Sequence, residues 1–504
     1  MSILWPMAYV IWLRRWAITD TISSSMSKFY ITTSIPYVNG EPHLGHALEF
    51  IYADVLARYA RQQGIENVLF STGSDEHGSK IAEKANQLGI SPLDLSTQNT
   101  KKFLELLKQL NISNDRFIRT TDQAHEQRAQ LVWKDLSEHI YKKKYIGWYC
   151  VGCEEYVTET FAKENNSVCP NHNRPYEQLA EENYFFGLSK FNNLIKQAIN
   201  EDSFKIVPIT KKNEILSVIN GGLEDISISR PVDKVSWGVP VPGDESQVMY
   251  VWFEALLNYI TVLGYPEYKD FSEYWPADVQ VIGKDILRFH AAIWPGILLG
   301  LKLPLPKVLY VHGFVNVDGK KMGKSLGNSI APSEILNKYG TEAFRYYFMR
   351  HIPSYNDGDF SWDKMESAYN NELANELGNA VGRVSAMLSK YQADVVGNIP
   401  EPNHDIHDYQ EALDNCQLDK ALDEVWEQVR GINQYIDTEK PWTIAKSGDS
   451  QHLQEVLAYC VGCLLEIADL LLPFMPETSA KIQEVFKDGL ITPLKEPLFP
   501  KNEN

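Results

Sequence analysis

The sequence has few cysteines and lacks a long unbroken apolar run, the features typical of secreted proteins and of membrane proteins. Six cysteines in 504 residues are too few for a disulfide scaffold, which predicts a reducing, cytoplasmic compartment. The most apolar segment, residues 458–475, is interrupted by Glu466 and Asp469, so it falls short of the roughly 18 unbroken apolar residues of a membrane helix. We therefore expect a soluble protein with no membrane partner.

Basic residues are also outnumbered. The 48 Lys and Arg face 66 Asp and Glu, and the formal net charge of −18 excludes an affinity of the whole surface for nucleic acid or anionic lipid. Any polyanion would have to bind a local patch. The length and the hydrophobic content of 44% are enough for about three domains.

A complete phosphate-binding P-loop is missing as well. The stretch VDGKKMGKSLGN, Val317–Asn328, contains Gly-Lys-Ser, but Gly319 and Gly323 enclose three residues where a P-loop needs four. Its three lysines and three glycines still suit contact with an anion.

Residues 1–27 differ in composition from the rest of the chain. They are rich in tryptophan, and Arg14 and Arg15 split a short apolar run. A secretory signal places its basic residues before the apolar region, and a transit peptide carries more arginine and lacks an acidic residue such as Asp20. We expect a disordered extension or a misassigned start, with the fold beginning near Lys28.

The chain then shows the pattern of a parallel α/β sheet. A β-rich run at residues 29–37 leads through a loop into an amphipathic helix that ends at Gly64, and a second strand with a helix from about Ser79 repeats the plan. The pattern resumes at residues 279–283, with a helix from Lys284, and at residues 307–317. We expect one interrupted sheet that binds ligands at the carboxyl ends of its strands.

The interruption, residues 141–186, carries two pairs of metal-ligand residues. Cys150 and Cys153 are followed, after fifteen residues, by Cys169 and His172. Two such turns hold a four-coordinate structural zinc ion. A thioredoxin-like motif would open a helix, whereas EEYVTET after Cys153 favours a strand, and a disulfide pair does not suit a reducing compartment.

Two motifs follow the first two strands. His43 and His46 open a helix with Gly45 between them, a position that attracts anions. Metal ligation is the rival interpretation, but no acidic residue stands at metalloprotease spacing. GSDEHG, residues 73–78, ends the next strand, so its Asp, Glu and His side chains should project into one crevice. There the carboxylate of Asp75 would hold an ammonium or a ribose hydroxyl; the alternative is a solvated turn.

After about residue 366 the sequence is almost wholly helical. Glu366–Tyr391, about Tyr409–Tyr435 and Leu453–Leu472 have the periodicity of long amphipathic helices in a separate bundle. Cys460 and Cys463 lie in the last of these, with no partner ligands nearby in sequence, and are assigned to core packing.

Together these motifs resemble those of the class I aminoacyl-tRNA synthetases. HLGH looks like the HIGH signature and KKMGKS like the KMSKS loop of a split Rossmann fold. In detail TTSIPYVNGEPHLGH, TGSDEHG, the four-ligand knuckle, YVWFEALLNY, IGKDILRFHAAIWP and HGFVNVDGKKMGKSLGN resemble the methionyl-tRNA synthetase family, from about Lys28 to the C-terminus. The resemblance implies a methionine–tRNA ligase that uses L-methionine, ATP with Mg²⁺, and tRNA(Met), and holds one structural Zn²⁺.

The resemblance also implies site residues. The catalytic residues would be His43, His46, Lys321 and Lys324, and ATP would contact these four with Gly45 and Ser325. Methionine would be bound by Ile35, Tyr37, Asp75, Arg230, Trp252, Ala255, Tyr259, Ile286, His290 and Trp294. For any one of the aromatic residues, core packing is otherwise the simpler interpretation. The CAU anticodon would be read by Asn379, Arg383 and Trp442, for which the alternative is a surface polar pair and a buried tryptophan.

The sequence departs from the family in a few places. Gly323 replaces the serine usual in the KMSKS loop, which puts loop closure in doubt. There is one four-ligand knuckle where some relatives have two. The insertion is too short for an editing domain, and few residues follow Phe499, which leaves no room for a dimerising tRNA-binding module. We therefore expect a monomer.

The expected fold is α/β: a split Rossmann-type parallel sheet with a zinc-knuckle insertion, followed by an all-α anticodon-binding bundle. The expected limits are 28–140 and 226–345 for the two catalytic halves, 141–225 for the insertion, 346–366 for a linker that contacts the tRNA stem, and 367–504 for the bundle. Two rival functions stay open: a cysteinyl-type synthetase, whose substrate pocket uses zinc, and a non-catalytic RNA-binding homologue. The aromatic residues speak against the first and the intact signature motifs against the second.

Overall fold

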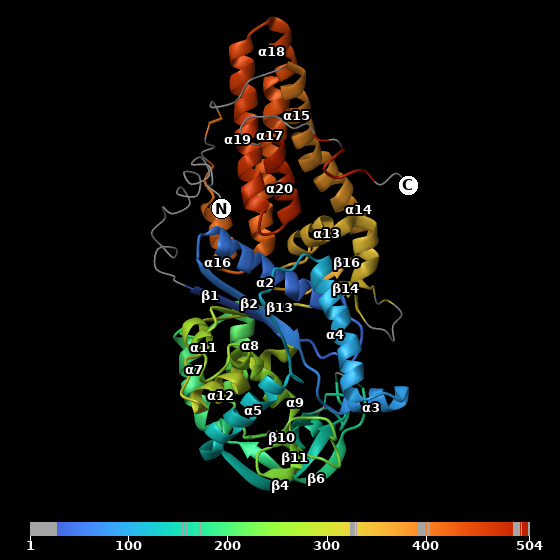
Figure 1. Ribbon diagram of the computed structural model, residues 1–504, viewed down its shortest axis with the longest axis vertical. Coiled ribbons are helices and arrows are strands. Elements are labelled where there is room, and N and C mark those ends of the chain that lie inside the picture. Colours follow the sequence, from blue (N-terminus) through green and yellow to red (C-terminus); the bar gives the residue numbers. More distant parts are fainter. Residues whose placement is uncertain are drawn as a thin grey trace, which may run out of the picture.

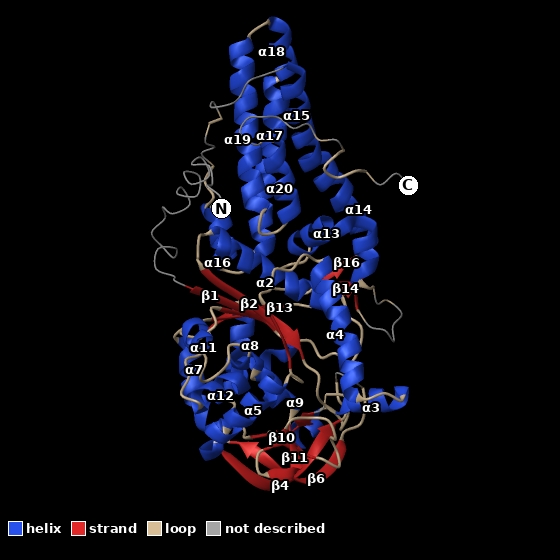
Figure 2. Cartoon of the chain, viewed as in Figure 1, coloured by secondary structure: helices blue, strands red, loops and turns tan. Residues whose placement is uncertain are grey.

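In the computed structural model an α/β body carries a tall helical bundle on one side of its main sheet, and two of the smaller sheets lie at the opposite end (Figure 1). Strands and helices alternate up to residue 360, and helices follow in the described part beyond it (Figure 2). The structure describes residues 28–153, 155–157, 159–170, 173–322, 328, 330–391, 399–400, 404–486, 494 and 496–501.

The α/β body is built on a six-stranded sheet of order β3-β2-β1-β12-β13-β7, in which all neighbours are parallel. The chain order reverses between β1 and β12. Open α/β sheets bind ligands beside such a switch point, outside the carboxyl ends of the strands. The strands are β1 (Lys28–Thr33), β2 (Asn67–Ser74), β3 (Arg116–Arg119), β7 (Lys205–Val207), β12 (Val279–Gly283) and β13 (Val308–His312).

Both faces of this sheet are buried, which explains its continuous apolar strands. Successive residues point to opposite sides, so Ile31 joins one core while Tyr30 joins the other. The first core also contains the apolar residues of the bundle. Its helices in the α/β body are α2 (Leu44–Gln62), which packs on the sheet, α4 (Pro92–Gln109) and α13 (Pro332–Arg350), which pack on α2, and α3 (Ser79–Leu88), which packs on α4. The second core lies on the other face of the sheet. Its helices are α5 (Gln123–Asp135), α7 (Asn192–Asn200), α8 (Ile209–Asn220), α9 (Val251–Leu256), α10 (Asn258–Thr261), α11 (Lys269–Tyr274) and α12 (Trp294–Gly300).

The insertion forms a four-stranded antiparallel sheet of order β5-β4-β6-β8, beside a three-stranded sheet of order β10-β11-β9. Strand β7 also falls in the range expected for the insertion, yet it pairs with β13 at the edge of the main sheet. The elements are β4 (Ile140–Cys150), β5 (Glu155–Val157), α6 (Glu159–Glu164), β6 (Glu177–Phe186), β8 (Ile226–Ser227), β9 (Ser229–Pro231), β10 (Pro240–Val241) and β11 (Asp244–Met249), with short 3₁₀ turns at Ser137–His139 and Leu188–Phe191.

The bundle begins with one long helix, in which a π-helical stretch joins two α-helices. Its elements are α14 (Trp362–Ser367), the π-helix η7 (Ala368–Gly378), α15 (Asn379–Tyr391), α16 (His407–Asp414), α17 (Leu418–Glu439), α18 (Pro441–Ser447), α19 (Ser450–Leu471) and α20 (Pro476–Val485). Elements α17, η7 and α20 pack on α13 of the α/β body, and α18 forms the far tip of the bundle (Figure 1).

Three expected elements differ from the structure. The helix expected over Tyr409–Tyr435 is two helices, because Cys416 takes a φ of 56° between them. The helix expected from Lys284 begins as a 3₁₀ turn at Lys284–Ile286 and a π turn at Phe289–Ile293; the π turn stands directly before α12, in which Pro295 has no N–H to donate. The strand expected after Cys153 is only β5, and helix α6 follows it. Helix α13 runs across the limit expected at residue 345.

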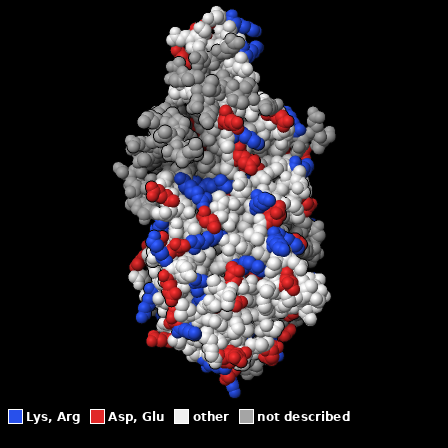
Figure 3. All heavy atoms as spheres, viewed as in Figure 1, with Lys and Arg blue, Asp and Glu red and all other residues white. Residues whose placement is uncertain are grey.

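Charge is mixed on the face shown in Figure 3, where Lys and Arg are interspersed with Asp and Glu. Among the helices the structure describes, none has both the length and the apolar character that crossing a membrane requires.

Candidate active site

The carboxyl edge of the sheet at the switch point gathers residues from three strands. Ile35 and Tyr37 follow β1, Asp75 follows β2, and Ile286 and His290 follow β12. Tyr37 and Asp75 form a parallel bridge, so the segments after β1 and β2 continue side by side past the sheet. Residues separated by up to 255 positions in the sequence, Ile35 and His290, therefore lie at one edge.

His43 and His46 cap the N-terminus of α2. Nδ1 of His43 accepts the Gly45 N–H at 3.1 Å, and Nδ1 of His46 accepts the His43 N–H at 3.2 Å. The two rings stack with centroids 3.6 Å apart. Because Nδ1 accepts in both rings, each neutral imidazole carries its proton on Nε2. The pair thus supplies two N–H donors at a helix N-terminus, an arrangement that favours an anion.

The environment keeps His46 neutral. Burial, with smaller contributions from His43 and His312, lowers the pKa of His46 well below its ordinary value. A neutral ring retains the tautomer that the capping hydrogen bond selects, so at neutral pH His46 acts as a hydrogen-bond donor rather than as a charge.

Three of the expected pocket residues form one buried cluster. Tyr259, His290 and Trp294 are each at most 2% exposed, and the rings of Tyr259 and Trp294 lie 5.6 Å apart. His290 Nδ1–H donates to the Ile286 carbonyl at 3.0 Å, which leaves Nε2 to accept the Tyr259 hydroxyl at 2.7 Å. Burial lowers the pKa of His290 to about 4. The cluster is therefore neutral and aromatic, a surface that suits an uncharged, polarizable group.

The remaining expected residues have other neighbours. Trp252 is partly buried and stacks on Phe289 with ring centroids 4.2 Å apart, and Ala255 is buried in the same helix, α9. The guanidinium of Arg230 lies 4.3 Å above the ring of Tyr250 and donates to the Ser229 carbonyl at 2.7 Å. The structure thus places Arg230 beside Tyr250.

The structure corrects the expectation that all three charged residues of GSDEHG face one crevice. The Glu76 carboxylate is fully buried and accepts hydrogen bonds from both nitrogens of the Arg119 fork at 2.8 Å. It also accepts from the hydroxyls of Ser74, Thr100 and Thr121. These five hydrogen bonds from four residues hold the Glu76 carboxylate inside the fold. His77 faces Glu254. Of the three residues, only Asp75 keeps the position expected of it at the end of β2.

His77 belongs to a buried charged network beneath the site. Its Nδ1 lies 2.8 Å from Glu254, whose other oxygen lies 2.9 Å from Nε2 of His125. Burial opposes a charge on His77, but the carboxylates of Glu254 and Glu126 outweigh it and raise the pKa of His77 to about 10. His77 is therefore protonated at neutral pH and forms a buried ion pair with Glu254.

The KMSKS-like stretch begins as a β-hairpin. β14 (Val315–Val317) and β15 (Lys320–Lys321) are joined by a two-residue turn in which Asp318 and Gly319 have φ of 50° and 71°, the geometry of a type I′ turn. The Gly319 N–H donates to the carboxylate of Asp359 at 2.6 Å. Asp359 is the middle residue of β16 (Gly358–Phe360), which pairs with β14. Gly323, Lys324 and Ser325 lie outside the described residues.

Cys150, Cys153 and Cys169 come together as expected. Their sulfur atoms lie within 4.8 Å of one another, with 3.6 Å between those of Cys153 and Cys169. A tetrahedral zinc ion with bonds of roughly 2.3 Å separates its sulfur ligands by about 3.8 Å. The three thiols therefore fit three corners of such a site and could bind a metal ion. His172, the expected fourth ligand, lies outside the described residues. Cys460 and Cys463 are buried in α19 among apolar side chains, as expected.

The expected anticodon residues lie toward the tip of the bundle. Asn379 and Arg383 are one helical turn apart on α15, and the Arg383 guanidinium lies 5.8 Å above the ring of Trp442, at the start of α18. Arg383 also pairs with Asp437 at 2.6 Å. Trp442 is partly exposed, so the three residues form a polar surface with one aromatic face.

The chain is similar to known proteins over most of its length. The family model for class I tRNA synthetases (M) matches residues 29–179 and 166–385. A methionine–tRNA ligase of Thermotoga maritima is 41% identical over 479 residues, which cover 91% of this chain and 75% of the relative. One of Brucella melitensis is 37% identical over 513 residues, 95% and 98% of the two chains. The chain belongs to the methionyl-tRNA synthetases.

Solved structures of methionyl-tRNA synthetases share the fold. The Mycobacterium tuberculosis enzyme bound by methionyl-adenylate matches with a TM-score of 0.85 and 33% identity, over 94% of this chain and 100% of that one. Its apo form matches with a TM-score of 0.80 and 30% identity, over 95% and 99%. The expected fold class, a split Rossmann-type sheet followed by a helical bundle, is confirmed.

Sequence reasoning missed one part of the site of this methionyl-tRNA synthetase. His312, the last residue of β13, lies buried at the carboxyl edge, and its Nε2 is 3.0 Å from Glu49 on α2. The other Glu49 oxygen accepts the Ser34 N–H at 2.7 Å, directly after β1. These contacts bind α2 to strands from both halves of the sheet. The sequence did contain a hint of this contact, a histidine followed by glycine at the end of an expected strand. Only the register of the sheet, however, shows that this histidine lies opposite Glu49.

The His77–Glu254 pair predicts an unusual pH dependence. A histidine whose pKa is raised on folding stabilises the fold fully below its unfolded value of about 6.5, and loses this effect as the pH rises toward 10. His77→Gln should lower the free energy of unfolding by about 3–5 kcal/mol at pH 6.5, and by less at pH 9.5, as measured by urea unfolding. His407→Gln, at an exposed histidine, serves as the control and should change the free energy of unfolding by about 0.5 kcal/mol or less at both pH values. A gap for His77→Gln that widens with pH would contradict the assignment.

Proposed function

We propose that this chain activates methionine with ATP to methionyl-adenylate and transfers the methionyl group to the 3′ end of tRNA(Met). The observation that carries the proposal is the meeting, at one switch-point edge, of an anion-binding histidine pair from one half of the sheet and a neutral aromatic cluster from the other. The relatives named methionine–tRNA ligase and the related enzyme solved with methionyl-adenylate support it.

The proposed methionine pocket separates the two ends of the amino acid. The carboxylate of Asp75, at the end of β2, holds the ammonium group. The thioether packs against Tyr259, His290 and Trp294, because sulfur makes favourable contacts with aromatic rings and the neutral His290 adds no charge. The other residues proposed to surround methionine are Ile35, Tyr37, Trp252, Ala255 and Ile286.

In the first step a carboxylate oxygen of methionine attacks the α-phosphorus of ATP. A bond forms between these atoms as the bond to the bridging oxygen breaks, and pyrophosphate leaves. The Nε2–H groups of His43 and His46 donate to phosphate oxygens, and Lys321 and Lys324 balance the charge that gathers on the leaving group. ATP brings Mg²⁺ as part of the substrate. A terminal ribose hydroxyl of the tRNA then attacks the carbonyl carbon, and AMP leaves.

Amino-acid selectivity tests the proposal. With metal-replete protein, ATP and Mg²⁺, methionine should support ATP–pyrophosphate exchange at least about 100-fold better than leucine, isoleucine or cysteine, the discrimination that a buried pocket of fixed shape provides. The measurement is the initial rate of pyrophosphate incorporation into ATP for each amino acid. No exchange with methionine, or faster exchange with cysteine, would contradict the proposed function.

We further propose that the three-thiol cluster, with His172, holds one structural Zn²⁺ per chain. Plasma emission spectrometry of the purified protein should find about one zinc per chain, since four ligands form one closed site. Cys169→Ala should lose most of this zinc because it removes a thiolate ligand. Cys460→Ala, a buried thiol of the bundle, is the matched control and should retain it. Full zinc content in Cys169→Ala would overturn the ligand assignment.

The polar surface at the tip of the bundle is proposed to read the anticodon. Trp442 would stack on a splayed base, and Asn379 and Arg383 would hydrogen-bond to it. Stacking on an aromatic side chain contributes about 1–3 kcal/mol per base, so Trp442→Ala should lower kcat/KM for tRNA about 10- to 100-fold while methionine-dependent exchange stays unchanged. Tyr268→Ala, at an exposed ring of the α/β body, should change neither. Equal losses of charging and exchange in Trp442→Ala would indicate misfolding instead.

We also propose that the protein works in the cytoplasm as a monomer. The buried thiols of Cys416, Cys460 and Cys463, which form no disulfide, support a reducing compartment.

A further inference from the structure

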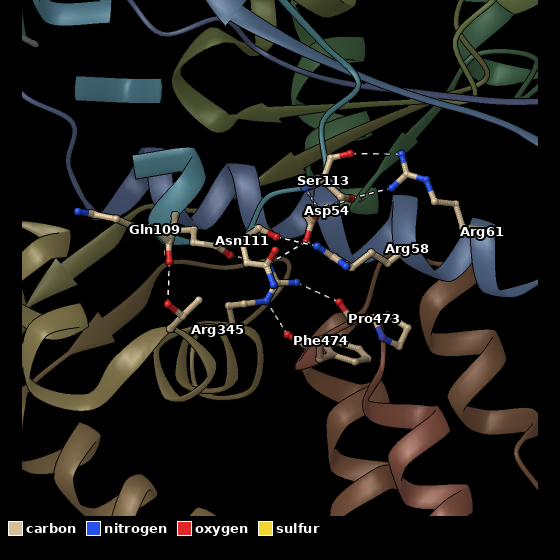
Figure 4. A network of polar contacts seen from close by, with 11 residues as sticks. Asp54, Arg58, Arg61, Gln109, Asn111, Ser113, Arg345, Pro473 and Phe474 are labelled. Atoms are coloured by element: carbon tan, nitrogen blue, oxygen red, sulfur yellow. Dashed lines mark hydrogen bonds and ion pairs between the residues drawn. The ribbon is translucent and has the colours of Figure 1, made fainter. Parts of the chain in front are cut away.

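One buried ion pair joins the two halves of the catalytic domain. Asp54 lies on α2, the helix that begins at the histidine pair, and Arg345 lies on α13, which comes from the second half of the domain. Arg345 Nη1 is 2.7 Å from Asp54 Oδ2, and both side chains are 0% exposed. Figure 4 shows the Arg345 guanidinium lying between α2 and the bundle.

The same guanidinium also binds the bundle. Its Nε donates to the Phe474 carbonyl at 2.6 Å and its Nη2 to the Pro473 carbonyl at 3.0 Å, in the turn between α19 and α20. Nη1 donates to the Leu110 carbonyl, at the end of α4, at 3.1 Å. The planar fork of an arginine fixes the directions of these bonds, so one side chain holds three parts of the fold in a single arrangement.

Asp54 is equally constrained. Its Oδ1 accepts the N–H and the hydroxyl of Ser113, each at 2.6 Å, and its Oδ2 accepts Arg58 Nε at 2.8 Å beside Arg345 (Figure 4). Burial disfavours the carboxylate, but Arg345 and Arg58 outweigh it and keep the pKa of Asp54 below its ordinary value. A charged carboxylate with every oxygen engaged resists rotation of its helix.

Helix α2 carries this constraint to the site. Asp54 follows His43 by eleven residues, about 16 Å along a helix that rises about 1.5 Å per residue. The far end of α2 also rests on the bundle, because Gln62 Nε2 donates to the Asp469 carbonyl at 2.7 Å. Because a helix moves along its axis as a rigid unit, a shift of α2 at Asp54 would displace His43 and His46 by the same distance.

We propose that Arg345 is a positioning residue for adenylate formation. It holds α2, and with it the histidine pair, in register with the second half of the catalytic domain, which supplies Tyr259 and His290. Arg345 does not itself touch the substrates. This inference rests on the proposed function. Buried ion pairs contribute little net stability but specify one arrangement over its neighbours, and in-line attack depends on placement to within a fraction of an ångström.

The variant that tests the proposal is Arg345→Lys. Lysine keeps the charge beside Asp54 but lacks the fork that reaches the Pro473 and Phe474 carbonyls. The kcat of methionine-dependent ATP–pyrophosphate exchange should fall about tenfold or more, while the KM values for methionine and ATP change less than twofold, because a small displacement of the histidine pair is felt mainly in the transition state of the in-line attack. Rates are normalised to competent sites by active-site titration, so unfolded protein is not counted.

Arg350→Lys is the matched control. Arg350 lies on the same helix and pairs with Glu372 and Asp423 of the bundle, at 3.2 and 3.3 Å. Its exchange kcat should stay within twofold of the wild type. Where Arg345→Lys fails to fold, the variant Asp54→Asn with Arg345→Gln takes its place, since it removes both fully buried charges together and leaves only the partly exposed Arg58, which still donates to the Asn111 carbonyl. The same loss of kcat is expected.

Two results would overturn the inference: a normalised kcat for Arg345→Lys equal to that of Arg350→Lys, or a rise in KM with kcat unchanged. Both results count only if the wild-type protein itself catalyses methionine-dependent ATP–pyrophosphate exchange. Absence of exchange in the wild type contradicts the proposed function itself, and the inference with it.

Discussion

The pairing of β1 with β12 is the contact on which the site depends. Ile31 lies opposite Val279, and these partners are 248 residues apart in the sequence. The two strands run in parallel, so the segments that follow them leave the sheet at the same edge, and this brings the histidine pair of α2 near the aromatic residues that follow β12. Loop-closure entropy grows only slowly with length, so a large insertion between the halves costs the pairing little.

The helical bundle is packed against the same helices that position the site. Its apolar residues share one continuous core with α2 and α13, and Arg345 binds carbonyls of the bundle together with Asp54 of α2. The bundle therefore rests directly on the helix that carries the histidine pair, through Tyr409 of α16 against Tyr59 and through the Asp469 carbonyl of α19, which accepts Gln62 Nε2. A bundle attached by a flexible linker would place the tRNA end less exactly relative to the adenylate.

The sequence alone predicted those parts of the fold that depend on local pattern. The cysteine spacing brought three thiols together as expected, and the strand and helix periodicity predicted the split parallel sheet. What it missed depends on distant partners. Glu76 turns inward because Arg119 is the last residue of β3, the strand beside β2. Strand β7 joins the main sheet with only three residues, too few for a visible pattern. Arg345 looks like any arginine of an amphipathic helix until the packing of α13 on α2 is known.

The most direct measurement is a crystal structure of the chain with a non-hydrolysable analogue of methionyl-adenylate. The account predicts the analogue at the carboxyl edge between β1 and β12, with its thioether against Tyr259 and Trp294 and a phosphate-equivalent oxygen within hydrogen-bond distance of Nε2 of His43 or His46. An analogue bound away from this edge, or with its side chain outside the aromatic cluster, would contradict it.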